Sequence, residues 1–202
     1  MTLIAAHAEK NIISVQLRHN AVLRGMPDAL RAELESRFDI VEGSKGSVLM
    51  AQGVRTMEQY FILGGVLKRV VTNPEGREMI LRFAAEGDME TSYAAWRLGT
   101  PTPYSIVCVT KARVAKLPMP YWVEFMDRHP DFKAAFEFEI MRLMSEVMAH
   151  TITLHLLDAP GRVHRFERKH PELVEVIPQK QLAAHLNLST ETLSRLRKSG
   201  KI

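Results

Sequence analysis

A short polar face near the end of the sequence carries the residue types that read DNA. Thr190, Glu191, Ser194, Arg195 and Lys198 fall at the spacing of one helical face. An Arg can donate two hydrogen bonds to guanine O6 and N7, and a Glu can accept one from cytosine N4. The pattern therefore predicts base contacts from Arg195 and Glu191, with Thr190 and Ser194 as secondary contacts to bases or phosphates.

Further polar residues around this face are predicted to meet the DNA backbone rather than the bases. Arg197 and Lys198 follow the base-reading positions, whereas Gln179 and Lys180 begin the preceding helix. Cationic and amide side chains at such positions hold phosphates, which sets the register of a protein on the duplex. Ser189, directly before the reading helix, completes the predicted DNA-binding set.

The element that must position these residues is a helix-turn-helix over residues 179–198. Two short helices would be held together by small or branched apolar side chains, namely Leu182, Ala183, Leu186, Leu188, Leu193 and Leu196. Asn187 tolerates the left-handed backbone that the tight turn needs, and Ser189 is a favourable cap for the second helix. The alternative is an ordinary helical hairpin, whose leucines would have the same spacing.

Positive charge is concentrated in the same part of the chain. Residues 160–202 contain nine Lys and Arg against four Asp and Glu, an excess of five. The whole chain has 27 basic and 23 acidic residues, so the remainder has a net charge of −1. A polyanion would therefore be attracted to the C-terminal segment, with binding that falls steeply as salt rises.

Composition places the chain among globular proteins. It has 202 residues, of which 46% are hydrophobic and 25% charged. No run reaches the roughly 18 to 20 apolar residues that cross a bilayer, and no basic region precedes the short apolar patch at the N-terminus. We therefore expect a cytoplasmic protein without a membrane partner. The single cysteine, Cys108, excludes an internal disulfide and an iron-sulfur cluster, and it is expected to be buried as a small hydrophobe.

Residues 43–117 have the pattern of short strands and tight turns. The β-rich pieces 59–63, 66–72, 78–83 and 104–109 alternate with Gly- and Pro-containing turns such as 73–76 and 99–103. Strands at this spacing predict an antiparallel sandwich or roll. Residues 27–37 upstream have helical spacing, so the whole chain is predicted to be of the α+β class.

After Pro118 the period becomes helical, with a short helix over 120–128 and a long one from Pro130 to about Leu157. One face of the long helix forms a near-heptad stripe, namely Phe132, Phe136, Ile140, Leu143, Val147, His150 and Leu154. Such a stripe fits a core as well as a partner surface. Because Phe138, Met141, Met144, Met148 and Ile152 on other faces could pack on the β domain, we predict that the stripe is the seam of a parallel homodimer. His150 in it would set register or respond to pH.

The order of these parts and several residues resemble the Crp/Fnr family of bacterial transcription regulators over about residues 20–202. The likeness is carried by Gly46, Gly53, residues 60–68 (YFILGGVLK), 76–78 (GRE), 87–88 (GD), 177–183 (IPQKQLA) and 191–195 (ETLSR). The resemblance implies a β-roll sensory domain (1–118), a dimerisation helix region (119–157) and a winged-helix-like DNA-binding domain (158–202). It further implies a homodimer on an inverted-repeat operator, with RNA polymerase as a partner.

Two departures from the family pattern limit what the resemblance implies. Asp88 stands where cyclic-nucleotide binders have Glu, and no Arg occurs between Arg97 and Arg113 to hold a cyclic phosphate. Cyclic nucleotide binding is therefore not expected, and no cofactor is predicted, although haem held by His or Met stays open. Asp88, Thr102 and Tyr104 are the predicted contacts to an unidentified effector; alternatively Tyr104 or Trp96 fills the pocket. Only four residues follow the reading helix, so we expect a truncated wing.

Two other function classes were weighed against this interpretation. A cupin-like enzyme would hold a metal with histidines inside the roll, but no His occurs between His19 and His129. No catalytic triad, phosphate loop or paired-carboxylate motif is recognisable, so we predict a protein that is not an enzyme. The alternative is a small-molecule-binding roll whose C-terminal helices contact another protein.

Overall fold

The computed structural model describes residues 2–202, which divide into two compact units. One unit consists of the residues up to 69 together with 83–142, and the other of residues 70–82 together with 143–202. Residues 70–82, expected in the N-terminal domain, thus group with the C-terminal helices.

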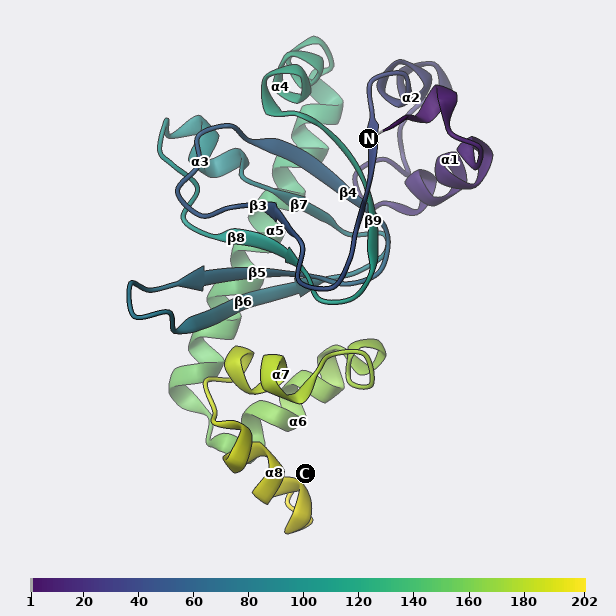
Figure 1. The fold of residues 1–202 in the computed structure, drawn as a ribbon. Helices are drawn as coiled ribbons and strands as arrows, with labels where there is room; N and C mark the ends of the chain where they lie inside the picture. The colour runs from purple at the N-terminus through teal and green to yellow at the C-terminus, as the bar shows by residue number, and fades with distance from the viewer. Residues whose placement is uncertain (1) are drawn as a thin grey trace. The chain divides into compact units, whose positions relative to one another are not determined.

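The strands form two antiparallel sheets (Figure 1). The first has the order β1-β2-β9-β4-β7, with bounds Thr2–Leu3, Asp39–Gly43, Ala112–Pro118, Glu58–Gly64 and Met89–Thr91. The second has the order β3-β8-β5-β6, with bounds Val48–Met50, Ser105–Cys108, Leu67–Thr72 and Glu78–Ala84. The four β-rich pieces of the sequence correspond to β4, β5, β6 and β8, and the α+β class with antiparallel sheets is confirmed.

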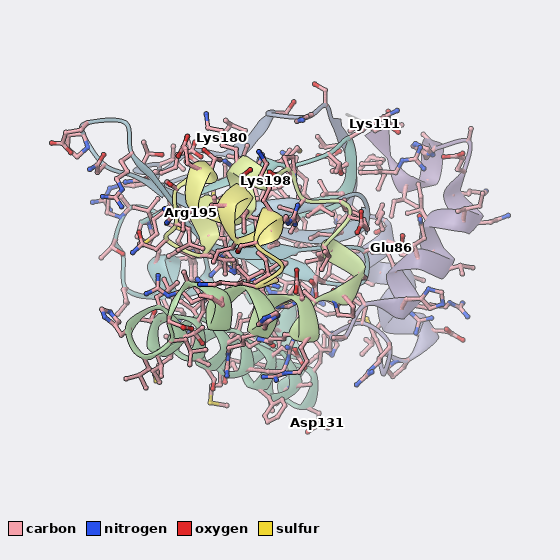
Figure 2. All side chains as sticks on the ribbon, turned by 90° about the horizontal axis from the view of Figure 1, so that it is seen from below. Glu86, Lys111, Asp131, Lys180, Arg195 and Lys198 are labelled. Atoms are coloured by element: carbon pink, nitrogen blue, oxygen red, sulfur yellow. The ribbon has the colours of Figure 1, made fainter. Side chains whose placement is uncertain are left out.

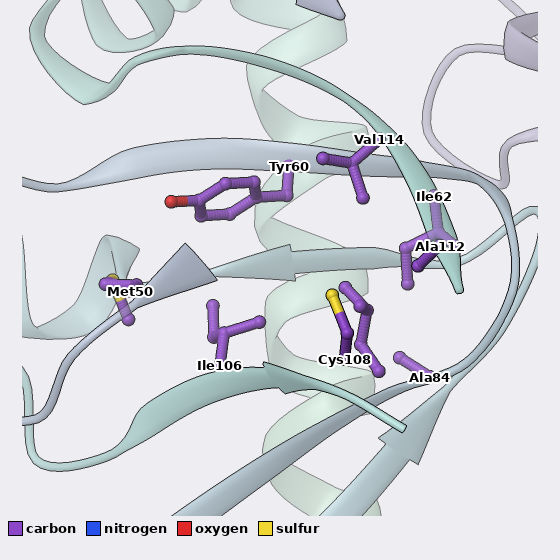
Figure 3. Close-up of a cluster of buried hydrophobic side chains, with 9 residues drawn as sticks. Met50, Tyr60, Ile62, Ala84, Ile106, Cys108, Ala112 and Val114 are labelled. Carbon is purple, nitrogen blue, oxygen red and sulfur yellow. The ribbon is translucent and has the colours of Figure 1, made fainter. Parts of the chain in front are cut away.

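A buried cluster fills the roll with side chains from both sheets (Figure 3). Strands β4 and β9 contribute Tyr60, Ile62, Ala112 and Val114, and the second sheet contributes Met50, Leu67, Ala84, Ile106 and Cys108. Cys108 is 1% exposed, so its expected place in the core is confirmed. The alternation of inward and outward residues along each strand produces this core, because successive side chains point to opposite faces.

The passage from β4 to β5 requires glycine at one position. Gly65 has a φ of +82°, and a Cβ there would lie 2.2 Å from the carbonyl oxygen of Lys111 and 2.7 Å from the Cα of Ala112. No other residue type fits so close to the neighbouring backbone. This contact lets the chain leave the first sheet and enter the second.

Short helices accompany the roll: η1 (Ile4–Ala6), α1 (Lys10–His19), α2 (Asp28–Glu35), α3 (Tyr93–Arg97) and α4 (Met119–Arg128). Helices α2 and α4 correspond to the predicted helical segments. Trp122 of α4 is fully buried, and its ring meets Phe61 of β4 edge-on at 5.3 Å. Such aromatic pairs add stabilisation beyond the area they bury.

The long helix α5 (Pro130–Leu156) has the two apolar faces that the sequence predicted, but the face expected to pack on the β domain is exposed and part of the other face is buried. Phe136 and Leu143 of the predicted dimer seam are 0% and 4% exposed. The rings of Phe132 and Phe136 lie 5.5 and 5.2 Å from Trp122, and Phe136 also meets Tyr93 at 5.2 Å. The aromatic cluster around Trp122 therefore draws this face inward. Of the other members of the seam, Ile140, Val147, His150 and Leu154 are half-buried.

The opposite face of α5 is exposed, although it was expected to pack on the β domain. Phe138, Met141, Met148 and Ile152 are 62%, 62%, 63% and 51% exposed. Together with the exposed Ala134, Ser145 and His155 they form a stripe at steps of 4, 3, 4, 3, 4 and 3 residues. That is the spacing of a coiled-coil seam.

The C-terminal helices are α6 (Ala159–Lys169), η2 (Pro171–Leu173), α7 (Gln179–His185) and α8 (Thr190–Lys198). They enclose their own core, with Val163, Phe166, Leu173, Ile177, Leu182 and Leu193 all at most 5% exposed. Asp158 caps α6 by accepting a hydrogen bond from the Gly161 amide at 2.9 Å. Among residues 2–202 no helix is both long and apolar enough to cross a bilayer.

Candidate nucleic-acid interface

The turn between α7 and α8 has the predicted geometry. Asn187 has a φ of +52°, the one non-glycine residue in the left-handed region among residues 2–202. The Leu188 amide donates to the Ala183 carbonyl at 2.9 Å, and the Ser189 hydroxyl accepts from the Thr192 amide at 3.1 Å. Both features confirm the sequence-based prediction of a tight turn followed by a capped helix.

Apolar contacts fix α8 against α7. Leu182, Ala183, Leu186 and Leu193 are at most 2% exposed and Leu196 is 8% exposed, while Leu188 at the turn is half-buried. Two helices held by so short a connection through buried leucines form a rigid pair. The outward face of α8 is therefore presented by a fixed support.

The predicted base-reading residues lie on the outward face of α8. Glu191 and Arg195 are exposed, one helical turn apart, and Thr190 and Ser194 are half-buried. Hydrogen bonds from its own backbone amide, from the Ser189 hydroxyl and from the Thr190 hydroxyl lower the pKa of the Glu191 carboxyl. The carboxylate is thus an acceptor at neutral pH, but it must exchange these cap contacts for any contact with a base.

The cations of this surface have no carboxylate partners. Among residues 2–202 the side chains of Lys180, Arg195, Arg197 and Lys198 form no ion pair. Figure 2 labels Lys180, Arg195 and Lys198 on the C-terminal helices, and all three are exposed. Gln179 and Ser189 are exposed as well, so the whole predicted DNA-binding set lies on α7, α8 and the turn.

One basic residue of the C-terminal segment serves the fold instead. The Arg162 guanidinium donates to the carbonyls of Leu157 and Leu186 at 2.9 and 3.2 Å, which ties the start of α6 to the ends of α5 and α7. Arg162 therefore satisfies helix-end carbonyls that would otherwise lack partners.

A second set of contacts joins the β5–β6 hairpin to the helix-turn-helix, and sequence reasoning missed it. Ring nitrogen Nδ1 of His185 donates to the Ile80 carbonyl at 2.9 Å, and the Arg77 guanidinium donates to the Asn187 side-chain oxygen at 3.2 Å. His150 stacks on His185 with ring centroids 3.9 Å apart, and its Nε2 donates to the His185 carbonyl at 3.0 Å. No local sequence pattern signals a contact between residues about 105 positions apart.

Burial keeps both histidines neutral. Desolvation, followed by repulsion from His150, lowers the pKa of His185 to about 3. Desolvation also lowers the pKa of His150; the hydrogen bond to the His185 carbonyl opposes this shift, and Lys169, His170 and Arg165 add to it. A neutral imidazole has one donor nitrogen, and in each ring that donor is used by a backbone carbonyl.

The residues predicted to contact an effector take part in contacts within the roll. The Asp88 carboxylate accepts from the Ala85 amide at 3.0 Å in the turn before β7. Thr102 is 1% exposed and donates to the Ala51 carbonyl at 2.9 Å. The Tyr104 hydroxyl donates to the Thr91 carbonyl at 2.7 Å.

A buried ion pair lies beside Tyr104. The Arg69 guanidinium donates to one Glu90 oxygen from Nε at 3.0 Å and from Nη2 at 2.6 Å, and the Glu90 side chain is fully buried. The same guanidinium lies 4.3 Å from the Tyr104 ring centroid, a cation-π contact. Desolvation opposes the charge of Arg69, yet Glu90 and Tyr104 outweigh it and raise the pKa of Arg69. The arginine inside the roll is therefore already bound to a carboxylate of the chain.

Comparison with known proteins finds similar transcription regulators. The family model of the cyclic nucleotide-binding domain matches residues 40–129. The cAMP-activated global transcriptional regulator CRP of Salmonella typhimurium is 22% identical over 162 residues, which cover 75% of this chain and 77% of that protein. The relatives found are thus transcription regulators rather than enzymes.

Solved structures share the fold. The c-di-GMP responsive global regulator CLP of Xanthomonas campestris superposes with a TM-score of 0.72 at 13% identity, covering 86% of this chain and 92% of CLP. FixK2 of Bradyrhizobium japonicum gives a TM-score of 0.71 at 14% identity, covering 81% and 86%. With the matching family model and the CRP relatives, these likenesses confirm the resemblance inferred from the sequence: the chain is similar to Crp/Fnr-like regulators, and its residues 40–129 match the cyclic nucleotide-binding domain.

Proposed function

We propose that the protein is a sequence-specific, double-stranded DNA-binding transcription regulator that acts as a homodimer on an inverted-repeat operator. The observation that carries the proposal is the outward face of α8, where Glu191 and Arg195 stand one turn apart without an ion-pair partner among residues 2–202. The rigid α7–α8 pair presents this face, and the exposed cations around it favour a polyanion. Because the CRP relatives are named as transcriptional regulators, the proposed partners include RNA polymerase.

The reading mode follows from the geometry of helix-turn-helix proteins. The second helix lies in the major groove with its N-terminal residues at the base edges, and the first helix crosses the backbone. Arg195 would donate hydrogen bonds to guanine O6 and N7, and Glu191 would accept one from cytosine N4. Lys180, Arg197 and Lys198 would bind phosphates. Such a contact set gives both sequence preference and strong salt dependence.

The homodimer is proposed through the exposed stripe of α5. Its members are Ala134, Phe138, Met141, Ser145, Met148, Ile152 and His155, and their heptad spacing fits a parallel two-stranded seam. A two-fold axis along this seam would set two reading helices on half-sites about one helical turn apart. Hence the operator would be an inverted repeat.

The β-roll is the proposed binding site of an effector. Asp88, Thr102 and Tyr104, which form hydrogen bonds within the roll, are its proposed contacts. Because Arg69 is held by Glu90, a cyclic phosphate would have to displace a buried carboxylate to reach it. We therefore infer that the effector is not a cyclic nucleotide.

Affinity selection of genomic DNA fragments, without added ligand and at two salt concentrations, tests the proposal. Enrichment of an inverted repeat is the expected result. Weak, salt-sensitive binding to all sequences would instead require an effector to align the reading heads. Absence of binding at low salt would exclude the DNA-binding function and favour a protein partner for the C-terminal helices.

The seam is tested by replacing Met141 and Met148 together with Glu. Two like-charged pairs in an apolar seam should dissociate the dimer to monomers in analytical ultracentrifugation, with loss of the tight operator complex. Leu98→Glu is the matched control, because Leu98 is 76% exposed and lies outside α5. A double variant that remains dimeric would contradict the assignment of this face.

A further inference from the structure

A hollow of about 230 Å³ opens between the tip of the β5–β6 hairpin and the helix-turn-helix. It is lined by Arg77 and Glu78 from the hairpin and by Lys180, Ala183, Ala184, Asn187, Leu188 and Thr190 from α7, the turn and α8. Two cations against one carboxylate leave the lining with a net positive charge. All of these residues belong to the C-terminal compact unit.

The hairpin tip is fixed, so Arg77 is held at the edge of this hollow. The Arg77 amide donates to the Asn73 side chain at 2.8 Å, and the Asn73 amide donates to the Arg77 carbonyl at 3.1 Å. Gly76 closes the tip with a φ of +79°, which suits glycine. Further along β6, Ile80 is anchored to His185. Because the tip is already ordered, ligand binding costs less conformational entropy there.

The position of the hollow links it to the nucleic-acid surface. Lys180 stands at the start of α7, the helix that crosses the DNA backbone in a helix-turn-helix, and Thr190 stands at the start of α8, whose N-terminal residues lie at the base edges. Arg77 reaches the turn between them through Asn187, and its side chain forms no ion pair among residues 2–202. A planar guanidinium here can donate two parallel hydrogen bonds to a phosphate.

We propose that this hollow receives a phosphate of the DNA backbone, so that Arg77 of the hairpin and Lys180 of α7 hold it together. The inference rests on the proposed DNA-binding function and adds to it a contact from outside the helix-turn-helix. A phosphate contact carries no sequence information, so Arg77 adds affinity and register rather than specificity. The β5–β6 hairpin would then contact bound DNA directly.

The test compares Arg77→Ala with the unaltered protein on a selected operator and on an unrelated duplex over a series of salt concentrations. Arg77→Ala should weaken binding to both duplexes by about the same factor. The negative slope of the logarithm of the binding constant against the logarithm of the salt concentration should become shallower by about 0.9 per half-site. Arg77→Lys should keep the slope because the charge remains. Arg24→Ala, at an exposed arginine before α2, is the matched control and should change neither quantity.

A second variant separates phosphate binding from support of the turn. Asn187→Gly keeps the left-handed conformation and removes the acceptor of the Arg77 hydrogen bond. It should leave the salt slope unchanged. If Asn187→Gly reproduced the whole effect of Arg77→Ala, Arg77 would act by holding the turn and the proposal would be wrong.

The remaining outcomes are also decisive. Tighter DNA binding by Arg77→Ala would mean that the hairpin obstructs the DNA, and an unchanged slope would mean that no phosphate is held; either overturns the inference. Binding of inorganic phosphate, measured by calorimetry and abolished by Arg77→Ala without a change in DNA binding, would assign the hollow to a free anion instead. If the unaltered protein bound no DNA, the proposed function itself would fail.

Discussion

Arg69 in the β-roll and Arg195 in the last helix carry the same guanidinium in opposite surroundings. Arg69 is nearly buried and donates twice to the fully buried Glu90, under the ring of Tyr104. Arg195 is exposed and forms no ion pair among residues 2–202. The chain's charge count treats these two residues alike, although one is satisfied inside the protein and the other is available to a partner.

The same contrast extends to their neighbours. In the unit of the roll, Arg113 pairs with Glu9 and Glu42, Lys116 with Glu58, and Lys133 with Asp127. On α7 and α8 the cations Lys180, Arg197 and Lys198 are left without such pairs. Unpaired cations on a rigid helix pair can neutralise phosphates without first giving up a carboxylate. This availability on one face of a rigid helix pair, rather than net charge, is what the proposed nucleic-acid surface offers.

Replacement of Arg69 is expected to have the largest effect, and it should affect folding only. Arg69→Met leaves the Glu90 carboxylate buried without its cation, which should lower the free energy of unfolding by about 3–5 kcal/mol. Urea denaturation measures this loss. The double variant Arg69→Met with Glu90→Leu should recover most of it, since an apolar pair of similar volume replaces the ion pair.

DNA affinity per folded molecule should be unchanged in both variants. A loss below about 1 kcal/mol for Arg69→Met would mean that solvent reaches Glu90 and that the roll has space for a ligand beside it.

Replacement of Arg195 should show the opposite behaviour. Arg195→Ala should weaken specific DNA binding by about 1–3 kcal/mol and relax the choice at one base pair per half-site. The free energy of unfolding should stay within about 0.5 kcal/mol, because the exposed side chain holds nothing in the fold. Competition binding on operators with single base changes measures the preference. Equal weakening on every sequence would assign Arg195 to a phosphate.

Most of the elements that support this contrast could be predicted from the sequence because they depend on local patterns. Asn187 at a left-handed turn and Ser189 as a cap act within a few residues, and the structure has both. Short strands between Gly- and Pro-containing turns identified the roll for the same reason. In contrast, α1 was not predicted, although Ile13 and Leu17 are buried four residues apart on one of its faces; the exposed Ile12 and Val15 add apolar residues outside that face.

The packing of α5 differs from the expectation for a physical reason. Both faces of the helix are apolar, so periodicity alone could not decide which one is covered. The decision comes from Trp122 and Tyr93, which gather Phe132 and Phe136 into one aromatic cluster. These contacts join segments far apart in sequence, and the same is true of the Arg69–Glu90 pair and of Arg77 at Asn187.

The stacked histidines give a third case, a titratable pair that is neutral and buried, and the smallest expected effect. In the folded state the pKa of His185 is lowered to about 3, whereas an unfolded histidine titrates near 6.5. Between these values the unfolded chain binds more protons, so stability is fully present above pH 6.5 and is lost as pH falls towards 3. From pH 7 to pH 5.5, His185 should account for a loss of about 1 kcal/mol.

His185→Leu isolates this contribution, since leucine does not titrate. The variant should be less stable at pH 7, because the hydrogen bond to the Ile80 carbonyl is lost, but its stability should fall less between pH 7 and pH 5.5. His19→Gln, at an exposed histidine, should keep the pH dependence of the unaltered protein. An equally steep fall in His185→Leu would place the titration on other groups, His150 among them. The contacts of His185 with Ile80 and of Arg77 with Asn187 would then persist at acidic pH, and among these groups only the cation Arg77 would respond to DNA.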